Sequence, residues 1–124
     1  MARAAAWLLP SREIASSAWA SGNVLASAGD LAGPGDALLR AAPRRGMTRW
    51  VEAFGDAPEY GLGLMHIRLA GQEAWGHSGD IYGFHGDLWY LPSADVTVVE
   101  LVNRNLQHAR RRLVEALARV AAGD

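Results

Sequence analysis

A short run of residues, His77-Ser78-Gly79-Asp80, has side chains suited to holding a polar substrate. A positive or proton-donating imidazole beside a hydroxyl can hold a substrate carboxylate. Glycine in a strand lets a ligand approach the backbone closely, and a free strand N–H just after it can face a developing oxyanion. All 12 basic residues of the chain are arginine. Without lysine, the chain cannot build a Ser-x-x-Lys nucleophile.

The chemistry of this run depends on the strand that carries it. Residues two apart in a strand share a face, so His77 and Gly79 would point one way and Ser78 the other. A twist or bulge at the glycine would instead bring His77 and Ser78 toward one edge. The run Gly76 to Asp80 also resembles a nucleophile elbow, but Gly-x-Ser-x-Gly needs a glycine where Asp80 stands.

Other chemistry-bearing residues have simpler explanations. Imidazole and carboxylate groups bind zinc, but the candidate ligands show no metal-binding spacing, so we expect hydrogen-bonded or solvated histidines and no metal or cofactor. These candidates are His66, His77, His85 and Asp80. The run Arg110-Arg111-Arg112 is expected to be a solvated helix face. Trp75 and Trp89 are expected in the core, although both lie near the motif and could border a pocket.

Length and charge set outer bounds. With 124 residues the chain is expected to be one domain, 1–124. A net charge of −1 gives no attraction for nucleic acid or anionic membranes. The absence of cysteine excludes disulfides and thiolate catalysis. The apolar run Ala4 to Leu9 is too short for a signal core or a membrane span, so any external location would require sequence upstream.

Residues 1–59 predict short helices and loops. Ser27 stands three residues before Asp30 and is a candidate helix cap, whereas Asp36 could cap a separate turn over Ala37 to Ala42 with Leu38 and Leu39 inward. Gly33-Pro34-Gly35 places a continuous helix here in doubt. Met47 to Phe54 predicts a further short helix from apolar spacings of three and four.

Residues 60–103 predict four strands in an antiparallel meander, because runs with a period near two are joined by short turns. The expected strands are Leu62 to Leu69, Glu73 to Gly79, Phe84 to Leu91 and Val96 to Val102. The last strand is apolar on both faces, so helices should cover both. Residues 104–122 predict a C-terminal helix, with a candidate cap at Asn103 or Asn105. Its expected inward stripe is Leu106, Ala109, Leu113, Leu117, Val120 and Ala121. The predicted fold class is therefore α+β, a mostly antiparallel sheet with a helix on one face.

These separate motifs, in this order and spacing, resemble the C-terminal part of the serine beta-lactamase and D-alanyl-D-alanine carboxypeptidase family. The matching segments are Ala18 to Leu25, Ser27 to Ala32, Tyr60-Gly61-Leu62-Gly63, Gly76 to Gly79, Gly83-Phe84, Leu91-Pro92 and Val102-Asn103. His-Ser-Gly would replace the family's third motif, Lys-Thr-Gly. The nearest group contains class C beta-lactamases, carboxypeptidases and related esterases.

The resemblance implies roles for four residues. His77 would take the electrostatic and proton-relay place, Ser78 the carboxylate-binding hydroxyl, Gly79 the close-approach position and the Asp80 backbone N–H one half of the oxyanion hole. The nucleophilic serine, its lysine and Tyr-x-Asn have no counterpart, because the family carries them upstream of the part seen here.

The expected protein is a fragment of a serine hydrolase, inactive alone, with the missing N-terminal part of the domain as partner. Its acyl substrate would be a beta-lactam, peptidyl-D-Ala-D-Ala or an ester, and the resemblance implies a periplasmic or extracellular location. The alternative is a non-catalytic binding or scaffold module derived from the same fold. In either case, incomplete helical cover of the sheet predicts exposed apolar surface, dye binding or self-association.

Overall fold

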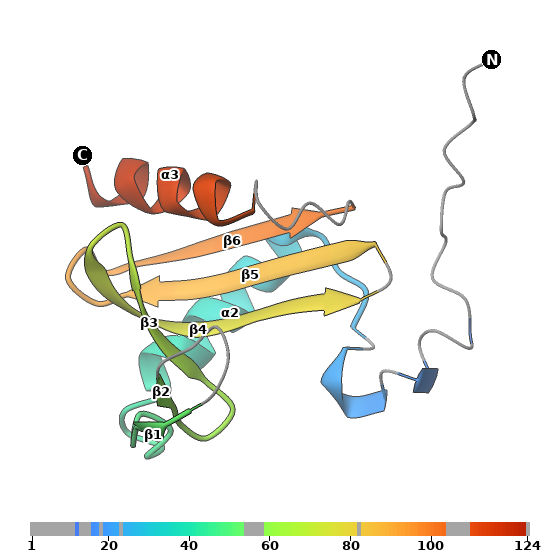
Figure 1. The fold of residues 1–124 in the computed structure, drawn as a ribbon, viewed down its shortest axis with the longest axis horizontal. Helices are drawn as coiled ribbons and strands as arrows, with labels where there is room; N and C mark the ends of the chain where they lie inside the picture. The colour runs from blue at the N-terminus through green and yellow to red at the C-terminus, as the bar shows by residue number, and fades with distance from the viewer. Residues whose placement is uncertain are drawn as a thin grey trace.

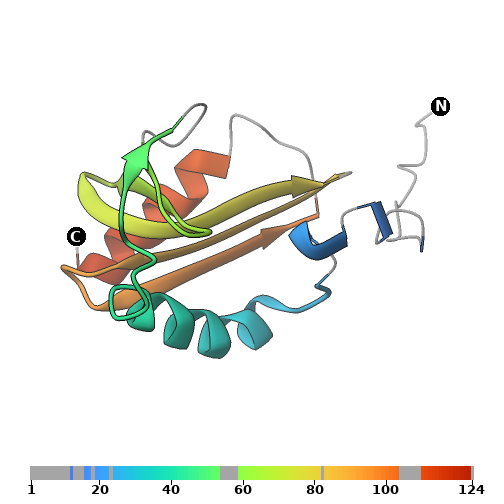
Figure 2. The same ribbon diagram turned by 90° about the horizontal axis from the view of Figure 1, so that it is seen from below.

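A computed structural model of the chain describes residues 12, 16–17, 19–22, 24–53, 59–81, 83–103 and 110–123. Within this part, a six-stranded sheet lies between two helices (Figures 1 and 2). The strands follow the chain order and each is antiparallel to the next. They are β1 (Val51–Glu52), β2 (Glu59–Tyr60), β3 (Met65–Leu69), β4 (Gln72–Ile81), β5 (Phe84–Leu91) and β6 (Val96–Val102). The predicted α+β class, with an antiparallel meander and a C-terminal helix, is confirmed.

The long helix before the sheet, α2 (Ala28–Ala41), begins at the cap that the sequence predicts. Ser27 Oγ accepts a hydrogen bond from the Asp30 backbone N–H at 3.2 Å, and the Asp30 carboxylate accepts one from the Ser27 N–H at 3.0 Å. Both bonds satisfy donors that the first helical turn leaves unpaired. The 3-10 turn η1 (Trp19–Ser21) lies earlier in the chain.

The prediction of a separate turn capped by Asp36 is wrong, because α2 continues through Pro34. Contacts with the sheet explain this continuity. Gly35 is buried, and a Cβ there would lie 2.8 Å from Leu88 Cδ1 on β5, so the missing side chain lets the helix approach closely. Arg40 then forms ion pairs with Asp36 and with Asp95 in the β5–β6 turn. These contacts offset the low helix propensity of glycine and proline.

The predicted helix over Met47 to Phe54 is also wrong. Residues 42–48 form turns and β1 follows at Val51–Glu52, while Phe54 lies outside the described residues. Trp50, one of the apolar residues that suggested a helix, instead stacks on His66 of β3, with ring centroids 4.6 Å apart and planes at 4°. Tertiary packing of the tryptophan therefore decides the local conformation.

The sheet has an apolar cluster on each face. One contains Ala74, Trp89, Leu91 and Val98 with two residues of the C-terminal helix, and the other contains Trp75 and Tyr90 with Leu39 of α2. Neighbouring residues such as Ala74 and Trp75 fall in different clusters because strand side chains alternate. The expectation that helices cover both faces is thus confirmed. Leu39 points inward as predicted, whereas Leu38 is 39% exposed.

The C-terminal helix, α3 (Arg110–Ala122), packs on the sheet through Val114 and Ala118. The predicted inward stripe is therefore wrong for its described members: Leu113, Leu117 and Val120 are 49%, 38% and 75% exposed, and Ala121 is exposed. Successive helical residues are about 100° apart, so the buried face lies one residue round from the leucines. The small Ala118 lets α3 lie close to the bulky Trp89 cluster.

Three further predictions concern residues outside the described part: Met1 to Pro10, the cap at Asn105, and the stripe positions Leu106 and Ala109. None of the described helices has the length and apolar character needed to cross a membrane.

Candidate active site

The four residues singled out by the sequence lie on β4, and its pairing with β5 is regular. The register advances one residue at a time from Trp75↔Tyr90 to Ile81↔Phe84. Without a bulge, His77 and Gly79 lie on the face toward α2, together with Trp75, whereas Ser78 and Asp80 belong to the opposite face. The continuous register thus contains no bulge that would bring His77 and Ser78 to the same side.

Beyond Gly76, one edge of β4 has no partner strand among the described residues. The pairing of β3 with β4 ends at Met65↔Gly76, while β5 continues alongside β4 as far as Ile81. From His77 onward, therefore, no described residue pairs with β4 on the β3 side. An unpaired strand edge presents backbone N–H and C=O groups that can bind an extended chain.

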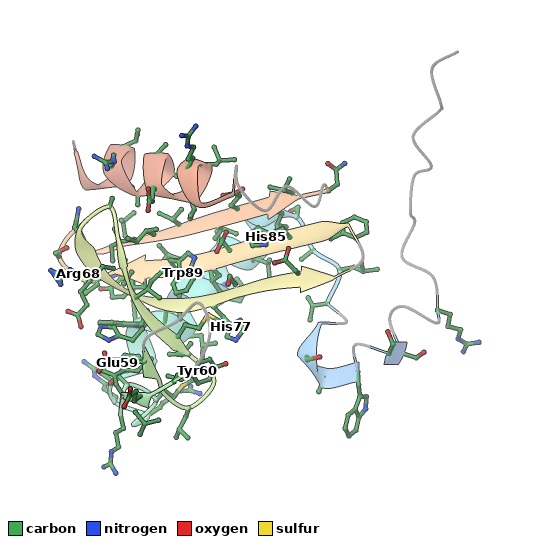
Figure 3. All side chains as sticks on the ribbon, viewed as in Figure 1. Glu59, Tyr60, Arg68, His77, His85 and Trp89 are labelled. Carbon is green, nitrogen blue, oxygen red and sulfur yellow. The ribbon has the colours of Figure 1, made fainter. Side chains whose placement is uncertain are left out.

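His77 is exposed, and both of its ring nitrogens have a hydrogen-bonding partner. Nδ1 lies 2.5 Å from the backbone oxygen of Ser78, and Nε2 lies 2.7 Å from the hydroxyl oxygen of Tyr60 on β2. The two rings meet edge to face, with centroids 5.9 Å apart. Figure 3 labels both side chains, His77 beside β4 and Tyr60 near β2. The sequence signal for Tyr60 was the segment Tyr60-Gly61-Leu62-Gly63, to which sequence analysis gave no chemical role.

Ser78 lies on the face of the sheet that α3 covers. Its hydroxyl donates a weak hydrogen bond to Met65 Sδ at 3.8 Å, and Asp87 of β5 is its partner in register. The hydroxyl thus does not adjoin the His77 ring on the α2 side. Its role in binding a carboxylate stays a prediction.

At Gly79, no side chain of its own covers the backbone of β4 on the face where His77 lies. It pairs with Gly86 of β5, so neither strand contributes a side chain to that row. A Cβ built at Gly79 would meet nothing within 4 Å. Next along β4, Asp80 pairs with His85, and their side chains lie 3.1 Å apart, from Oδ1 to Nδ1.

A buried polar cluster lies on the other face of the same strands, and sequence analysis missed it. His85, Asp87 and Glu100 are 7%, 6% and 5% exposed. His85 Nε2 lies 2.6 Å from Asp87 Oδ2, and Trp89 Nε1 donates to Asp87 Oδ1 at 2.7 Å. A signal was available, because residues 85, 87 and 89 alternate along one strand and Glu100 pairs with Asp87.

The three described histidines, His66, His77 and His85, lie at separate positions. His66 lies between Glu59 and Glu73, with its nitrogens 2.5 and 3.0 Å from their carboxylate oxygens, far in sequence from the His85 cluster. Within the described part of the chain, no three His, Asp or Glu side chains gather in a way that could hold a metal ion.

Glu100 is the member of the buried cluster with the poorest hydrogen bonding. Neither of its carboxylate oxygens has a hydrogen-bond partner among the described residues. Burial raises the pKa of Glu100 above its usual value, and the neighbouring Asp87 raises it further, while His85 opposes the shift. A carboxyl group with a raised pKa in the folded state destabilises that state as pH rises, because the unfolded chain ionises more readily.

We therefore expect Glu100→Gln to gain stability relative to the wild type between pH 4 and pH 8. The amide cannot ionise, so the variant loses the penalty that grows as the pH rises through the usual carboxyl pKa. Urea unfolding at several pH values measures this difference. Glu52→Gln, at an exposed position, is the control and should shift stability equally at all pH values. A pH-independent difference for Glu100→Gln would contradict the prediction.

The family comparison agrees with this arrangement of strands and helices. The Beta-lactamase family model matches residues 1–123, nearly the whole chain. The chain belongs to the Beta-lactamase family. Comparison with curated proteins and with solved structures gave no match. As a member of the Beta-lactamase family, the chain has a serine-hydrolase-like fold, and β4 is the strand on which its Gly-His-Ser-Gly motif lies.

Proposed function

We propose that this chain forms one wall of the active site of a serine hydrolase that acts through an acyl-enzyme. The observation that carries the proposal is the end of β4, where His77 and Gly79 lie on one face and no described residue pairs with the strand on its β3 side. A carbonyl group lying along this edge would lie beside the His77 imidazole and backbone N–H groups at once. Those are the groups that an acyl-transfer site needs beside its nucleophile.

The proposed reaction proceeds in two halves. A serine oxygen attacks the substrate carbonyl carbon, the carbonyl oxygen becomes an oxyanion, and the bond to the leaving nitrogen or oxygen breaks with transfer of a proton to it. Water then attacks the acyl-enzyme and restores the serine. In this scheme the Asp80 backbone N–H stabilises the oxyanion, and His77 supplies positive charge or a proton.

The nucleophile has to come from the N-terminal part of the same domain. No serine in the chain is followed three residues later by lysine. Ser78 is an unsuitable nucleophile because its hydroxyl faces Met65 and lies on the opposite face of β4 from His77. We propose as substrates a beta-lactam, peptidyl-D-Ala-D-Ala or an ester, met in the periplasm or outside the cell.

We expect the isolated chain to hydrolyse neither a chromogenic cephalosporin nor a nitrophenyl ester above background. When it is joined to the upstream half of a family domain that carries Ser-x-x-Lys and Tyr-x-Asn, activity should appear and His77→Ala should lower kcat/KM about 100-fold. His66→Gln, which alters a histidine held between two glutamates, is the control and should retain activity. Turnover by the isolated chain that Ser78→Ala abolishes, or an unchanged kcat/KM for His77→Ala, would overturn the proposal.

A binding module is the second candidate function, because no described residue pairs with β4 on the β3 side beyond Gly76, and such a strand edge can bind an extended peptide. Such a module would use the edge of β4 to bind an acyl peptide without turning it over. Calorimetric binding of a D-Ala-D-Ala peptide to the isolated chain, together with no activity after joining to the upstream half, would favour the module over the hydrolase.

A further inference from the structure

We infer that Tyr60 is a positioning residue that holds His77 in one tautomer, with the proton on Nδ1 and the Nε2 lone pair facing the tyrosine hydroxyl. The inference comes from the two short contacts of the His77 ring, 2.5 Å to the Ser78 backbone oxygen and 2.7 Å to Tyr60 Oη. The tautomer follows from geometry alone. Only its value for catalysis rests on the proposed function.

The Ser78 contact identifies the nitrogen that carries the proton, and the Tyr60 hydrogen bond to the other nitrogen holds the ring in that tautomer. A backbone carbonyl oxygen has lone pairs and no hydrogen, so it can only accept. Nδ1 must therefore donate, and in the neutral imidazole the remaining nitrogen, Nε2, is an acceptor. Tyr60 then donates its hydroxyl hydrogen to Nε2.

A tyrosine hydroxyl suits this place because it both donates and accepts. When His77 is neutral, Tyr60 donates to Nε2. When His77 gains a second proton, Nε2–H donates instead, and the hydroxyl accepts after rotating its hydrogen. The ring of His77 can thus change charge without losing its partner or its orientation. A group limited to donating or to accepting would fit only one of these states.

The turn between β2 and β3 places Tyr60 where it can reach His77. The Gly61 N–H donates to the Leu64 oxygen at 2.8 Å, and the Leu62 N–H donates to the Met47 oxygen at 3.1 Å. A Cβ at Gly61 would lie 2.1 Å from the Met47 oxygen, and Gly63 has φ +76°, so both glycines are required.

Strand register completes the placement. Tyr60 pairs with Met65, and Met65 pairs with Gly76, the residue before His77. Because no described residue of β3 pairs with His77, its ring can reach Tyr60 past the end of that strand. The role of the Tyr60-Gly61-Leu62-Gly63 segment is therefore to place the Tyr60 hydroxyl next to Nε2 of His77.

The test uses the full 124-residue chain labelled with 15N in histidine. Long-range 1H–15N correlation spectra distinguish a protonated from an unprotonated ring nitrogen and thus report the tautomer of each histidine. In the wild type at alkaline pH, His77 should show protonated Nδ1 and unprotonated Nε2. In Tyr60→Phe, which removes only the hydroxyl, its two nitrogen shifts should move toward the averaged values of mixed tautomers.

Tyr90→Phe is the matched control, because the Tyr90 hydroxyl donates to Asp95 at 2.7 Å and does not contact His77. It should leave the His77 signals unchanged, and equal urea midpoints for Tyr60→Phe and the wild type would exclude a general loss of structure. A wild-type His77 protonated at Nε2, or a His77 spectrum that Tyr60→Phe does not change, would overturn the inference.

A second readout separates this inference from the proposed function. In the chain joined to the upstream half, Tyr60→Phe should lower kcat/KM about 10-fold and alter the pH profile of kcat, while His77→Ala tests the histidine itself. If the tautomer is lost and kcat/KM stays unchanged while His77→Ala is inactive, the catalytic value of Tyr60 is refuted and the proposed function stands. If His77→Ala is fully active, the proposed function fails and the NMR result still decides the tautomer.

Discussion

Replacing Ala118 with aspartate is expected to destabilise the fold strongly, whereas aspartate at Leu113 should be tolerated. Ala118 is fully buried in the cluster of Trp89, Leu91 and Val98. A carboxylate placed there would be unpaired in apolar surroundings, at a cost of several kcal/mol, about 3–5 kcal/mol by analogy with broken buried ion pairs. Total stabilities of small domains are only about 5–15 kcal/mol, so this change removes a large share.

Leu113 provides the matched control on the same helix. It is 49% exposed, so aspartate there can remain hydrated. Urea unfolding followed by tryptophan fluorescence measures both variants. The Leu113→Asp protein should also bind less hydrophobic dye, because it interrupts the exposed row of Leu113, Leu117 and Val120 on α3. Equal destabilisation by the two substitutions would show that α3 packs through a different face.

The buried face of α3 differs from the predicted one, which shows a limit of predicting helix packing from sequence. Large leucines define the most hydrophobic stripe, and that stripe was predicted to face the sheet. In the structure Val114 and Ala118 face it instead. A helix lying over the large Trp89 side chain needs small side chains at the contact, and the size of the opposing residues is not visible in the helix's own periodicity.

Strands were predicted well where their patterns were long. The bounds of β5 and β6 match the expected Phe84 to Leu91 and Val96 to Val102. In contrast, β3 begins at Met65 in place of Leu62, and β4 extends over Gln72–Ile81. The two-residue strands β1 and β2 were missed, because two residues cannot show a period and their pairing depends on distant partners.

In the candidate site, too, the local motif was predicted and the contacts between distant residues were not. His77 was found because its motif is local, but neither Tyr60 as its partner nor the buried Glu100 was predicted. The hydroxyl of Tyr60 reaches His77 through the successive pairing of β2, β3 and β4. Glu100 meets His85 and Asp87 only after β5 and β6 align. Register between strands is a tertiary property, so single-residue patterns do not contain it.

The second prediction with a large effect concerns two glycines of β4 that lie three residues apart. Gly76→Ala should disrupt the sheet, because a Cβ there would lie 1.9 Å from the backbone oxygen of Leu88. Gly76 pairs with both Met65 and Trp89, so the clash falls where β4 has neighbours on both sides. Separating the strands should cost about 3 kcal/mol or more. The measurement is the urea midpoint, and a wild-type midpoint would contradict the register of β4 and β5.

Gly79→Ala is the control for folding and at the same time tests the site. A Cβ at Gly79 meets nothing within 4 Å, so the variant should fold with a midpoint close to that of the wild type. Under the proposed function, however, a methyl group would fill the space through which a substrate approaches the backbone beside His77. In the chain joined to the upstream half, Gly79→Ala should therefore lower kcat/KM at least about 10-fold with stability unchanged. Full activity would mean that the acyl group does not lie against this part of β4, and the edge of the strand would lose its proposed role.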